Sequence, residues 1–373
     1  MNILFITQLY PLDKNAKKTT FALHDFVKEW AKAHQVKVIR PYYHYEDEPP
    51  PASEQITIDG VEINILKPIW IPVIKKSLIN RKQVLKMINF KPDVVICHKN
   101  TAYLPFFFLK RQLNIPFVVG IHTTDILFSK NWLFKRRQLK VFRETDLLIF
   151  RSMVLKKYFL AAFKGLNIKR SHIANSGIPK HRIKKEKKIQ YSQTKNVIYV
   201  GELIARKNAD KILTALVDID CDFKLTIVGE GKIKEQLKSL IKRFNIQDKV
   251  VFTGYLQRED VFKEMDKNDY FIMPSKNETF GLVYIEAMAR GLVVVGMKNW
   301  GIDGIIVDGK NGFLCQNDKQ EQITKKIKEV MNLKLQEHQI IVNNSLATIR
   351  NLTKEKMVEA YLSAVSELVN ADN

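Results

Sequence analysis

Short apolar runs alternate with amphipathic stretches along the first half of the chain. The runs are too short for helices and predict buried strands at 3–7, 36–40, 93–98, 117–122 and 147–151. Between several of them, apolar residues recur at helical spacing, which predicts helices at 21–34, 78–88, 103–113 and 153–163. This alternation is typical of βαβ units, so we expect an α/β domain built on a parallel sheet.

The same alternation restarts in the second half. It predicts strands at 197–201, 224–229, 250–254, 270–274 and 293–296 and helices at 209–217, 233–244, 261–267, 319–331 and 354–369. A very basic segment with few apolar residues separates the two halves, and this composition indicates a linker. We therefore expect two doubly wound domains at 1–180 and 196–352, a linker at 181–195, and a C-terminal helix within 353–373.

The stretch 274–296 has a distinctive local pattern. An apolar run at 269–274 predicts a short buried strand that ends at proline, and a polar turn follows it. From Phe280-Gly281 onward, apolar residues recur at helical spacing until Gly291, after which the next buried strand begins. A helix that starts after a strand and a loop presents free backbone N–H groups, which suit an anion.

Two carboxylates flank this helix start. Glu278 lies in the loop before the helix, and Glu286 lies eight residues later, about two helical turns on. An acid near a helix start also complements the helix dipole, so Glu278 alone has a structural explanation of equal weight. Glu286 is a charged residue among apolar neighbours and therefore needs a partner or a ligand.

The combination of Glu278, Phe280-Gly281 and Glu286-Ala-Met-Ala289 resembles the signature of the retaining glycosyltransferases of family 4. The resemblance implies a GT-B fold, in which two Rossmann-like domains face a central cleft. It implies that the N-terminal domain binds the acceptor, the C-terminal domain binds a nucleotide sugar, and the last helix returns to the N-terminal domain. By this resemblance Glu278 holds donor-sugar hydroxyls, Glu286 holds the ribose, and the backbone around Thr279, Phe280 and Gly281 binds the diphosphate and sugar.

A second loop carries cations after a strand. The chain turns at Gly201 and enters a helix near Arg206-Lys207, where positive charge suits a diphosphate. The family has Gly-Arg-Leu followed by a lysine, and both cations bind pyrophosphate; Lys207 matches that lysine, whereas Glu202 stands at the usual arginine position. Arg206 is the candidate substitute for the missing arginine. The alternative is a solvated basic loop.

The segment His122-Thr-Thr-Asp125 resembles the family's His-Gly-Ser-Asp segment, in which the histidine contacts the donor sugar. Thr123 replaces the glycine and restricts the backbone there. A histidine at a strand end is otherwise often structural, and that is our interpretation of His98. His122, Glu278 and Lys207 are therefore the predicted catalytic residues, and Asp125 is a candidate acceptor residue.

Lysines rather than glycines occupy the first predicted βα loop. Lys17 and Lys18 lie where this family commonly places glycines against the donor phosphate, so they either bind a phosphate or form a solvated acceptor rim. Two other patterns carry little chemistry. The pair Gly229 and Gly231 lacks the third glycine of a dinucleotide fingerprint, and the DxD spelling at 218–222 is expected in a solvated loop rather than a metal site.

Charge is distributed unevenly over the 373 residues. The net charge is +22, of which residues 1–180 contribute +17 from 30 basic and 13 acidic side chains. Apolar and basic residues mix at 69–76 and 132–137, which suits an anionic membrane surface, although a core edge beside a solvated face explains them equally well. Three widely spaced cysteines fit a reducing compartment, and no signal peptide or spanning segment is recognisable. We therefore expect a cytoplasmic enzyme, peripherally associated with the inner face of the cell membrane.

The resemblance implies a metal-independent, retaining hexosyltransferase without cofactor. Its donor is a nucleotide-diphosphate sugar, with UDP favoured by family frequency, and its acceptor is a saccharide or polyprenyl-linked saccharide in cell-surface polysaccharide biosynthesis. One alternative is a basic protein on this fold that binds an anionic polymer or nucleic acid; no nucleic-acid module is recognisable, and two ligand-facing carboxylates would repel phosphates. The other alternative is a sugar-nucleotide epimerase.

Overall fold

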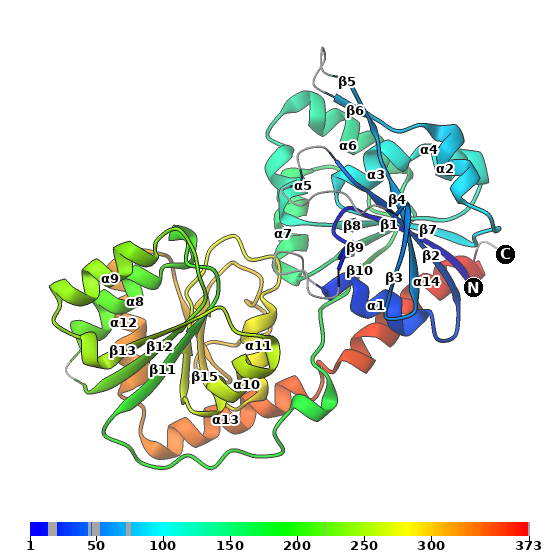
Figure 1. Cartoon of the computed structure of the whole chain (residues 1–373). Helices are drawn as coiled ribbons and strands as arrows, with labels where there is room; N and C mark the ends of the chain where they lie inside the picture. Colours follow the sequence, from blue (N-terminus) through cyan, green and yellow to red (C-terminus); the bar gives the residue numbers. More distant parts are fainter. Residues whose placement is uncertain (14–20, 44–45, 47–52, 72–75, 220, 372–373) are drawn as a thin grey trace. The chain divides into compact units, whose positions relative to one another are not determined.

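The computed structural model describes residues 1–13, 21–43, 46, 53–71, 76–219 and 221–371 (Figure 1). Its contacts divide the chain into two compact units. Unit 1 comprises residues 1–151, 155–175 and 357–373, and unit 2 comprises residues 152–154 and 176–356. The segment 181–195, which we expected as a linker, thus belongs to unit 2. Its apolar side chains Ile183 and Ile189 pack against the unit 2 core, and Lys187 Nζ donates to Asn268 O at 2.7 Å.

Unit 1 contains an eight-stranded sheet in the order β10-β9-β8-β7-β1-β2-β4-β3. The strands are β1 (Asn2–Thr7), β2 (Gln35–Pro41), β3 (Gln55–Ile58), β4 (Val61–Leu66), β7 (Val94–His98), β8 (Phe117–Ile121), β9 (Leu147–Phe150) and β10 (Ser171–Ile173). All neighbours pair in parallel except β3 and β4, which form a hairpin through Asp59 and Gly60 at positive φ. The Asp-Gly pair is a hairpin signal that the strand prediction above missed.

Helices cover both faces of the unit 1 sheet (Figure 1). They are α1 (Ala22–Trp30), α2 (Arg81–Met87), α3 (Asn100–Phe106), α4 (Phe108–Leu113), α5 (Thr123–Phe128), α6 (Trp132–Glu144), α7 (Met153–Ala162) and α14 (Lys354–Ala371). Side chains of β1 alternate between the faces. Ile3 and Phe5 pack with α1 and α14, whereas Leu4 and Ile6 pack in the cluster that includes α3 and α6. A separate small sheet pairs β5 (Ile69–Ile71) with β6 (Lys76–Leu78).

Unit 2 contains a six-stranded parallel sheet in the order β13-β12-β11-β14-β15-β16. The strands are β11 (Lys195–Val200), β12 (Phe223–Val228), β13 (Val250–Gly254), β14 (Tyr270–Ile272), β15 (Val293–Met297) and β16 (Phe313–Cys315). The α-helices are α8 (Ala209–Val217), α9 (Lys234–Arg243), α10 (Arg258–Asp266), α11 (Leu282–Ala289), α12 (Gln320–Met331) and α13 (Leu335–Ile349), with short 3-10 turns at Lys180–Arg182, Ala205–Lys207 and Gln247–Lys249.

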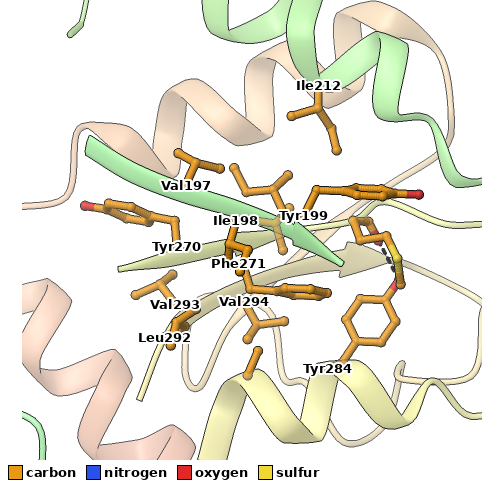
Figure 2. Close-up of a cluster of buried hydrophobic side chains, with 14 of the residues drawn as sticks. Val197, Ile198, Tyr199, Ile212, Tyr270, Phe271, Tyr284, Leu292, Val293 and Val294 are labelled. Atoms are coloured by element: carbon orange, nitrogen blue, oxygen red, sulfur yellow. Dashed lines mark hydrogen bonds between the residues drawn. The ribbon is translucent and has the colours of Figure 1, made fainter. Parts of the chain in front are cut away.

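The central strands of unit 2 are buried on both faces. Figure 2 shows their apolar side chains, including Phe271 and Val294, between helices on opposite sides of the sheet. Tyr284 of α11 lies in this core and donates from its hydroxyl to Met273 O, just after β14. The core therefore anchors α11 and the loop that precedes it, which contains Glu278.

The last helix belongs to unit 1 from Met357 onward. Its buried residues Tyr361 and Val365 lie in the same cluster as Phe26 and Trp30 of α1. Trp30 Nε1 also donates to Val358 O at 3.3 Å. Residues more than 300 positions apart in the sequence thus share one core.

Candidate functional site

The loop between β14 and α11 ends in an open helix start. Gly281 precedes the helix with φ 86°, and a Cβ there would lie 2.5 Å from the Tyr284 ring, so the position requires glycine. Within the described residues, no hydrogen bond occupies the backbone N–H groups of Phe280, Gly281 and Leu282. This helix start is therefore able to bind an anion, as the sequence predicts.

A glycine on a later loop holds this helix start in place. Gly301 N donates to Glu278 O at 3.0 Å, and a Cβ at position 301 would lie 2.5 Å from Phe280 N and 2.7 Å from the carbonyl carbon of Thr279. The two backbones touch because residue 301 has no side chain. This role of Gly301 could not be predicted from the sequence, since nothing local distinguishes it from other loop glycines.

Glu278 lies among polar and cationic groups in front of α11. Its Oε1 accepts from Ser275 Oγ at 2.9 Å and from Arg206 Nη1 at 3.1 Å, and Lys207 Nζ lies 3.8 Å from the same oxygen. The Glu278 side chain is 17% exposed. The structure thus brings together the carboxylate and both cations that the sequence singles out, although they are more than 70 residues apart.

Lys207 approaches Glu278 through a space left by glycine. A Cβ on Gly201 would lie 2.8 Å from Lys207 Nζ. Burial is the main influence on the ammonium and lowers the pKa of Lys207, while the negative charge of Glu278 opposes that shift. The side chain is 14% exposed, so its charge is poorly hydrated and available to an anionic ligand.

Two further glycines hold the turn that carries Gly201. A Cβ at Gly229 would lie 2.1 Å from Gly201 O, and one at Gly231 would lie 2.4 Å from Leu203 O. Leu203 N also donates to Glu230 O at 2.8 Å. Gly229 and Gly231 therefore allow close backbone contact within the protein. This structural role is independent of the dinucleotide fingerprint, whose third glycine the chain lacks.

Arg206 holds the Glu278 loop. Its Nη1 donates to Lys276 O at 3.0 Å as well as to Glu278 Oε1. Glu202 is exposed, and its carbonyl accepts from the Tyr199 hydroxyl at 3.0 Å. The charge of Arg206 thus lies beside Glu278, at the same loop as Lys207.

Glu286 has the partner that its apolar surroundings require. Glu286 is 9% exposed, and Arg258 Nη2 lies 2.7 Å from Glu286 Oε1. Arg258 begins α10, and its side chain is 46% exposed, so the pair opens to solvent on the arginine side. Arg258 could not be predicted from the sequence because a partner on another helix has no local signature.

In unit 1, Asp125 is a capping residue. Its Oδ2 accepts from His122 N at 2.7 Å, its Oδ1 accepts from Asn100 N at 2.8 Å, and the residue is fully buried. Burial raises the pKa of Asp125 to about 7, against the opposing effect of these backbone hydrogen bonds. The carboxylate thus positions the His122 loop, and a contact between Asp125 and the acceptor stays a prediction.

His122 is the first member of a chain of polar side chains. His122 Nε2 lies 3.2 Å from His98 Nδ1, and His98 Nε2 lies 2.9 Å from the Tyr361 hydroxyl. Gly120 makes room for this arrangement, since a Cβ there would lie 2.1 Å from His98 Nδ1. Burial, and then the positive charge of Arg151, lowers the pKa of His122 to about 3, so its ring is neutral at pH 7.

His98 is thus a partner of His122. His98 ends β7 and His122 follows β8, and the carboxyl ends of these neighbouring parallel strands meet at one sheet edge. That adjacency is the signal that could have identified the pair. Lys17 and Lys18 lie outside the described residues, as does part of the 69–76 segment.

Comparison with known proteins follows the division of the chain. A family model for group 1 glycosyl transferases matches residues 180–346, and a model for glycosyltransferase family 4 matches residues 21–182. An uncharacterized glycosyltransferase of Methanocaldococcus jannaschii is 27% identical over 289 residues, covering 74% of this chain and 79% of the relative. The sulfoquinovosyl transferase SQD2 of Arabidopsis thaliana is 28% identical over 272 residues, covering 67% of this chain and 52% of the relative.

Solved structures share the fold at low sequence identity. Sucrose-phosphate synthase from Thermosynechococcus elongatus superposes with a TM-score of 0.76 at 15% identity, covering 99% of both chains. Anabaena HepE in complex with UDP also gives 0.76, at 18% identity, covering 98% of this chain and 100% of that one. Together with the two family models, these similarities show that the chain belongs to glycosyltransferase family 4, has the GT-B fold and is a glycosyltransferase.

Proposed function

We propose that this glycosyltransferase moves a sugar from a nucleotide-diphosphate sugar, preferably a UDP-sugar, with retention of anomeric configuration. The observation that carries the proposal is the convergence of Glu278, Arg206 and Lys207 beside the open backbone N–H groups of α11. Support for the uridine base comes from HepE, which was crystallised with UDP and with UDP-glucose. The family assignment sets aside the nucleic-acid-binding and epimerase alternatives.

The proposed mechanism stabilises the leaving diphosphate. The bond between the anomeric carbon and the phosphate oxygen breaks, and negative charge develops on the diphosphate. Lys207 and the N–H groups of Phe280 and Gly281 are placed to receive that charge, so the proposal needs no metal ion. The acceptor hydroxyl then attacks the oxocarbenium-like carbon from the leaving-group side, and its proton passes to the departing phosphate oxygen.

Glu278 and His122 are proposed to hold the donor sugar. Glu278 already accepts hydrogen bonds through Oε1, and its carboxylate has lone pairs left for sugar hydroxyls. The role of His122 rests on the resemblance alone, and a neutral imidazole is able to donate or accept at a sugar hydroxyl. Glu286 is proposed to hold the ribose hydroxyls, as the resemblance implies.

We further propose that the acceptor is a saccharide or lipid-linked saccharide of a cell-surface polysaccharide and that the enzyme works at the inner face of the membrane. The excess positive charge of the first half supports an anionic partner. In the described part of the chain, none of the helices combines the length and the hydrophobicity that a membrane span requires. Any membrane association of the described part would therefore be peripheral.

A thermal-shift panel with UDP, GDP, ADP and their sugars, with and without EDTA, tests the donor. We expect stabilisation by uridine nucleotides that EDTA leaves unchanged. Glu278→Ala and Lys207→Ala should each reduce sugar transfer strongly, and NMR of the product should show the donor's anomeric configuration. Full transfer activity in both variants, or an inverted product, would contradict the proposed mechanism.

A further inference from the structure

The outer face of α6 combines exposed apolar and basic side chains. Gln138, Val141 and Phe142 point into unit 1, and Gln138 Nε2 donates to the Tyr103 hydroxyl at 2.8 Å and to Asp125 O at 3.0 Å. This anchoring fixes the rotation of the helix. The side chains left outside are Trp132, Leu133, Arg136, Arg137, Lys140 and Arg143.

The N-terminal end of this face is apolar. Trp132 is 64% exposed, Leu133 is 56% exposed, and Phe128 at the end of α5 is 53% exposed. Large apolar side chains gathered in one short stretch of surface are typical of an interaction site. We call Phe128, Trp132 and Leu133 the apolar tip. The Arg136 guanidinium lies 5.9 Å from the Trp132 ring centroid, so a cation directly borders the tip.

Charge in this region has one sign. Residues 126–143 contain six lysines and arginines and no aspartate or glutamate. The acid that follows this stretch, Glu144, is paired with Arg111, whose Nη2 donates to its two oxygens at 3.0 and 3.1 Å. Within the described residues, Arg137 and Lys140 form no ion pair with an acid. Their positive charge is therefore available to a ligand.

A recess beside α6 gathers four cations. It has a volume of about 620 Å³, and its walls include Arg81, Arg111, Arg137, Lys140 and the aromatic Phe107 and Phe108. A second, more apolar recess of about 530 Å³ lies between Phe128, Leu133, Arg136 and Arg137. Arg137 lines both recesses, so the basic recess and the apolar tip are parts of one continuous surface.

We propose that this surface docks on an anionic lipid bilayer: the apolar tip inserts among the acyl chains and the basic recess binds a lipid phosphate headgroup. The inference rests on the peripheral membrane association proposed above and assigns residues to it. A bilayer fits better than a soluble polyanion because only a bilayer offers an apolar phase to Trp132 and Leu133 next to a layer of phosphates. Lys135, by contrast, lies over the Phe163 ring at 5.7 Å and is not part of the docking surface.

Vesicle flotation of the full chain tests the proposal. The vesicles contain phosphatidylcholine alone or mixed with phosphatidylglycerol. We compare the recess variant Arg137→Gln/Lys140→Gln, the tip variant Trp132→Ser/Leu133→Ser, and the control Lys242→Gln/Arg243→Gln, which removes the same two residue types from exposed positions of α9 in unit 2. A UDP thermal shift on each protein reports the donor site independently.

Wild type and control should float with the mixed vesicles and not with phosphatidylcholine alone. The recess variant should bind about 30-fold more weakly, because each cation near an anionic surface contributes roughly 1 kcal/mol. The tip variant should also lose binding, and every protein should retain the UDP shift. Unchanged binding by the recess variant, equal loss in the control, or binding of heparin that needs the recess but not the tip would overturn the proposal.

Two further results separate the possible failures. If glycerol phosphate without vesicles stabilises the protein through Arg137 and Lys140 while the wild type does not float with the mixed vesicles, the recess is a small-anion site and the docking surface is refuted. If the UDP shift is absent while vesicle binding follows the expected pattern, the donor assignment fails and the docking surface stands. Loss of the UDP shift in the recess variant alone would indicate misfolding, and Lys140→Gln by itself then carries the test.

Discussion

Substituting Gly301 by alanine tests how precisely the helix start of α11 must be held. The new Cβ would lie 2.5 Å from Phe280 N and 2.6 Å from Phe280 Cα, whereas ordinary contacts begin at 3.4 Å. One backbone must therefore retreat by roughly 1 Å. Position 301 has no positive φ, so alanine adds no backbone strain of its own. The substitution therefore acts only through the steric clash with the loop that carries Glu278 and Phe280.

The expected cost to ligand binding is the loss of about one charge-assisted hydrogen bond to phosphate. Such a bond contributes roughly 1.5–3 kcal/mol, so the Kd for UDP should rise about 10- to 100-fold. Overpacking should also lower the stability of unit 2 by about 1–3 kcal/mol. Isothermal titration with UDP measures the first effect, and thermal unfolding measures the second.

Gly304→Ala is the matched control for Gly301→Ala. Gly304 lies on the same loop with φ 96°, and its Cβ would meet no atom closer than 4.0 Å. Alanine there should cost about 1–2 kcal/mol of backbone strain without touching Phe280. Gly304→Ala should thus unfold earlier but bind UDP like the wild type. A wild-type Kd in Gly301→Ala, or an equal rise in both variants, would refute the reasoning.

Four further outcomes are expected. The pKa of His122 is about 3 in the folded state and 6.5 in the unfolded state, so between these pH values the unfolded chain binds more protons and stability is lost as pH falls. His122→Gln should therefore flatten the pH dependence of stability measured by urea unfolding from pH 4 to 7. An unchanged slope would show that His122 does not cause this dependence. Tyr361→Phe leaves His98 Nε2 without its hydroxyl partner and should lower the free energy of unfolding by about 1–3 kcal/mol, whereas an unshifted urea midpoint would mean that the contact contributes nothing. Glu286→Ala should weaken UDP about tenfold or more while leaving pyrophosphate binding intact; an equal loss for both ligands would place Glu286 outside the ribose site. EDTA should not change the initial rate of sugar transfer, and a loss restored by Mg²⁺ or Mn²⁺ would show that the reaction needs a metal.

Local sequence patterns predict much of the α/β architecture. The predicted helix 209–217 matches α8 residue for residue, and the core strands lie within a few residues of the predicted ranges. Periodicity reports whether a segment buries one face or two, and that property belongs to the segment itself. The prediction of one helix over 103–113 missed the break between α3 and α4, near Pro105, which lacks a backbone N–H. The elements α6 and α13 were missed because their helical spacing was not recognised as such.

The partners of the site residues depend on contacts that no local pattern contains. His98 meets Tyr361 across 263 positions, Glu286 meets Arg258 on another helix, and Gly301 lies against Phe280. Motif spacing made Glu278 and Lys207 candidate site residues because each lies at the carboxyl edge of a strand in a recognisable strand–loop–helix unit. It could not reveal that Asp125 is buried, since burial is decided by how separate elements pack. Local sequence specifies the elements and their chemistry, whereas strand order and helix packing determine which side chains meet.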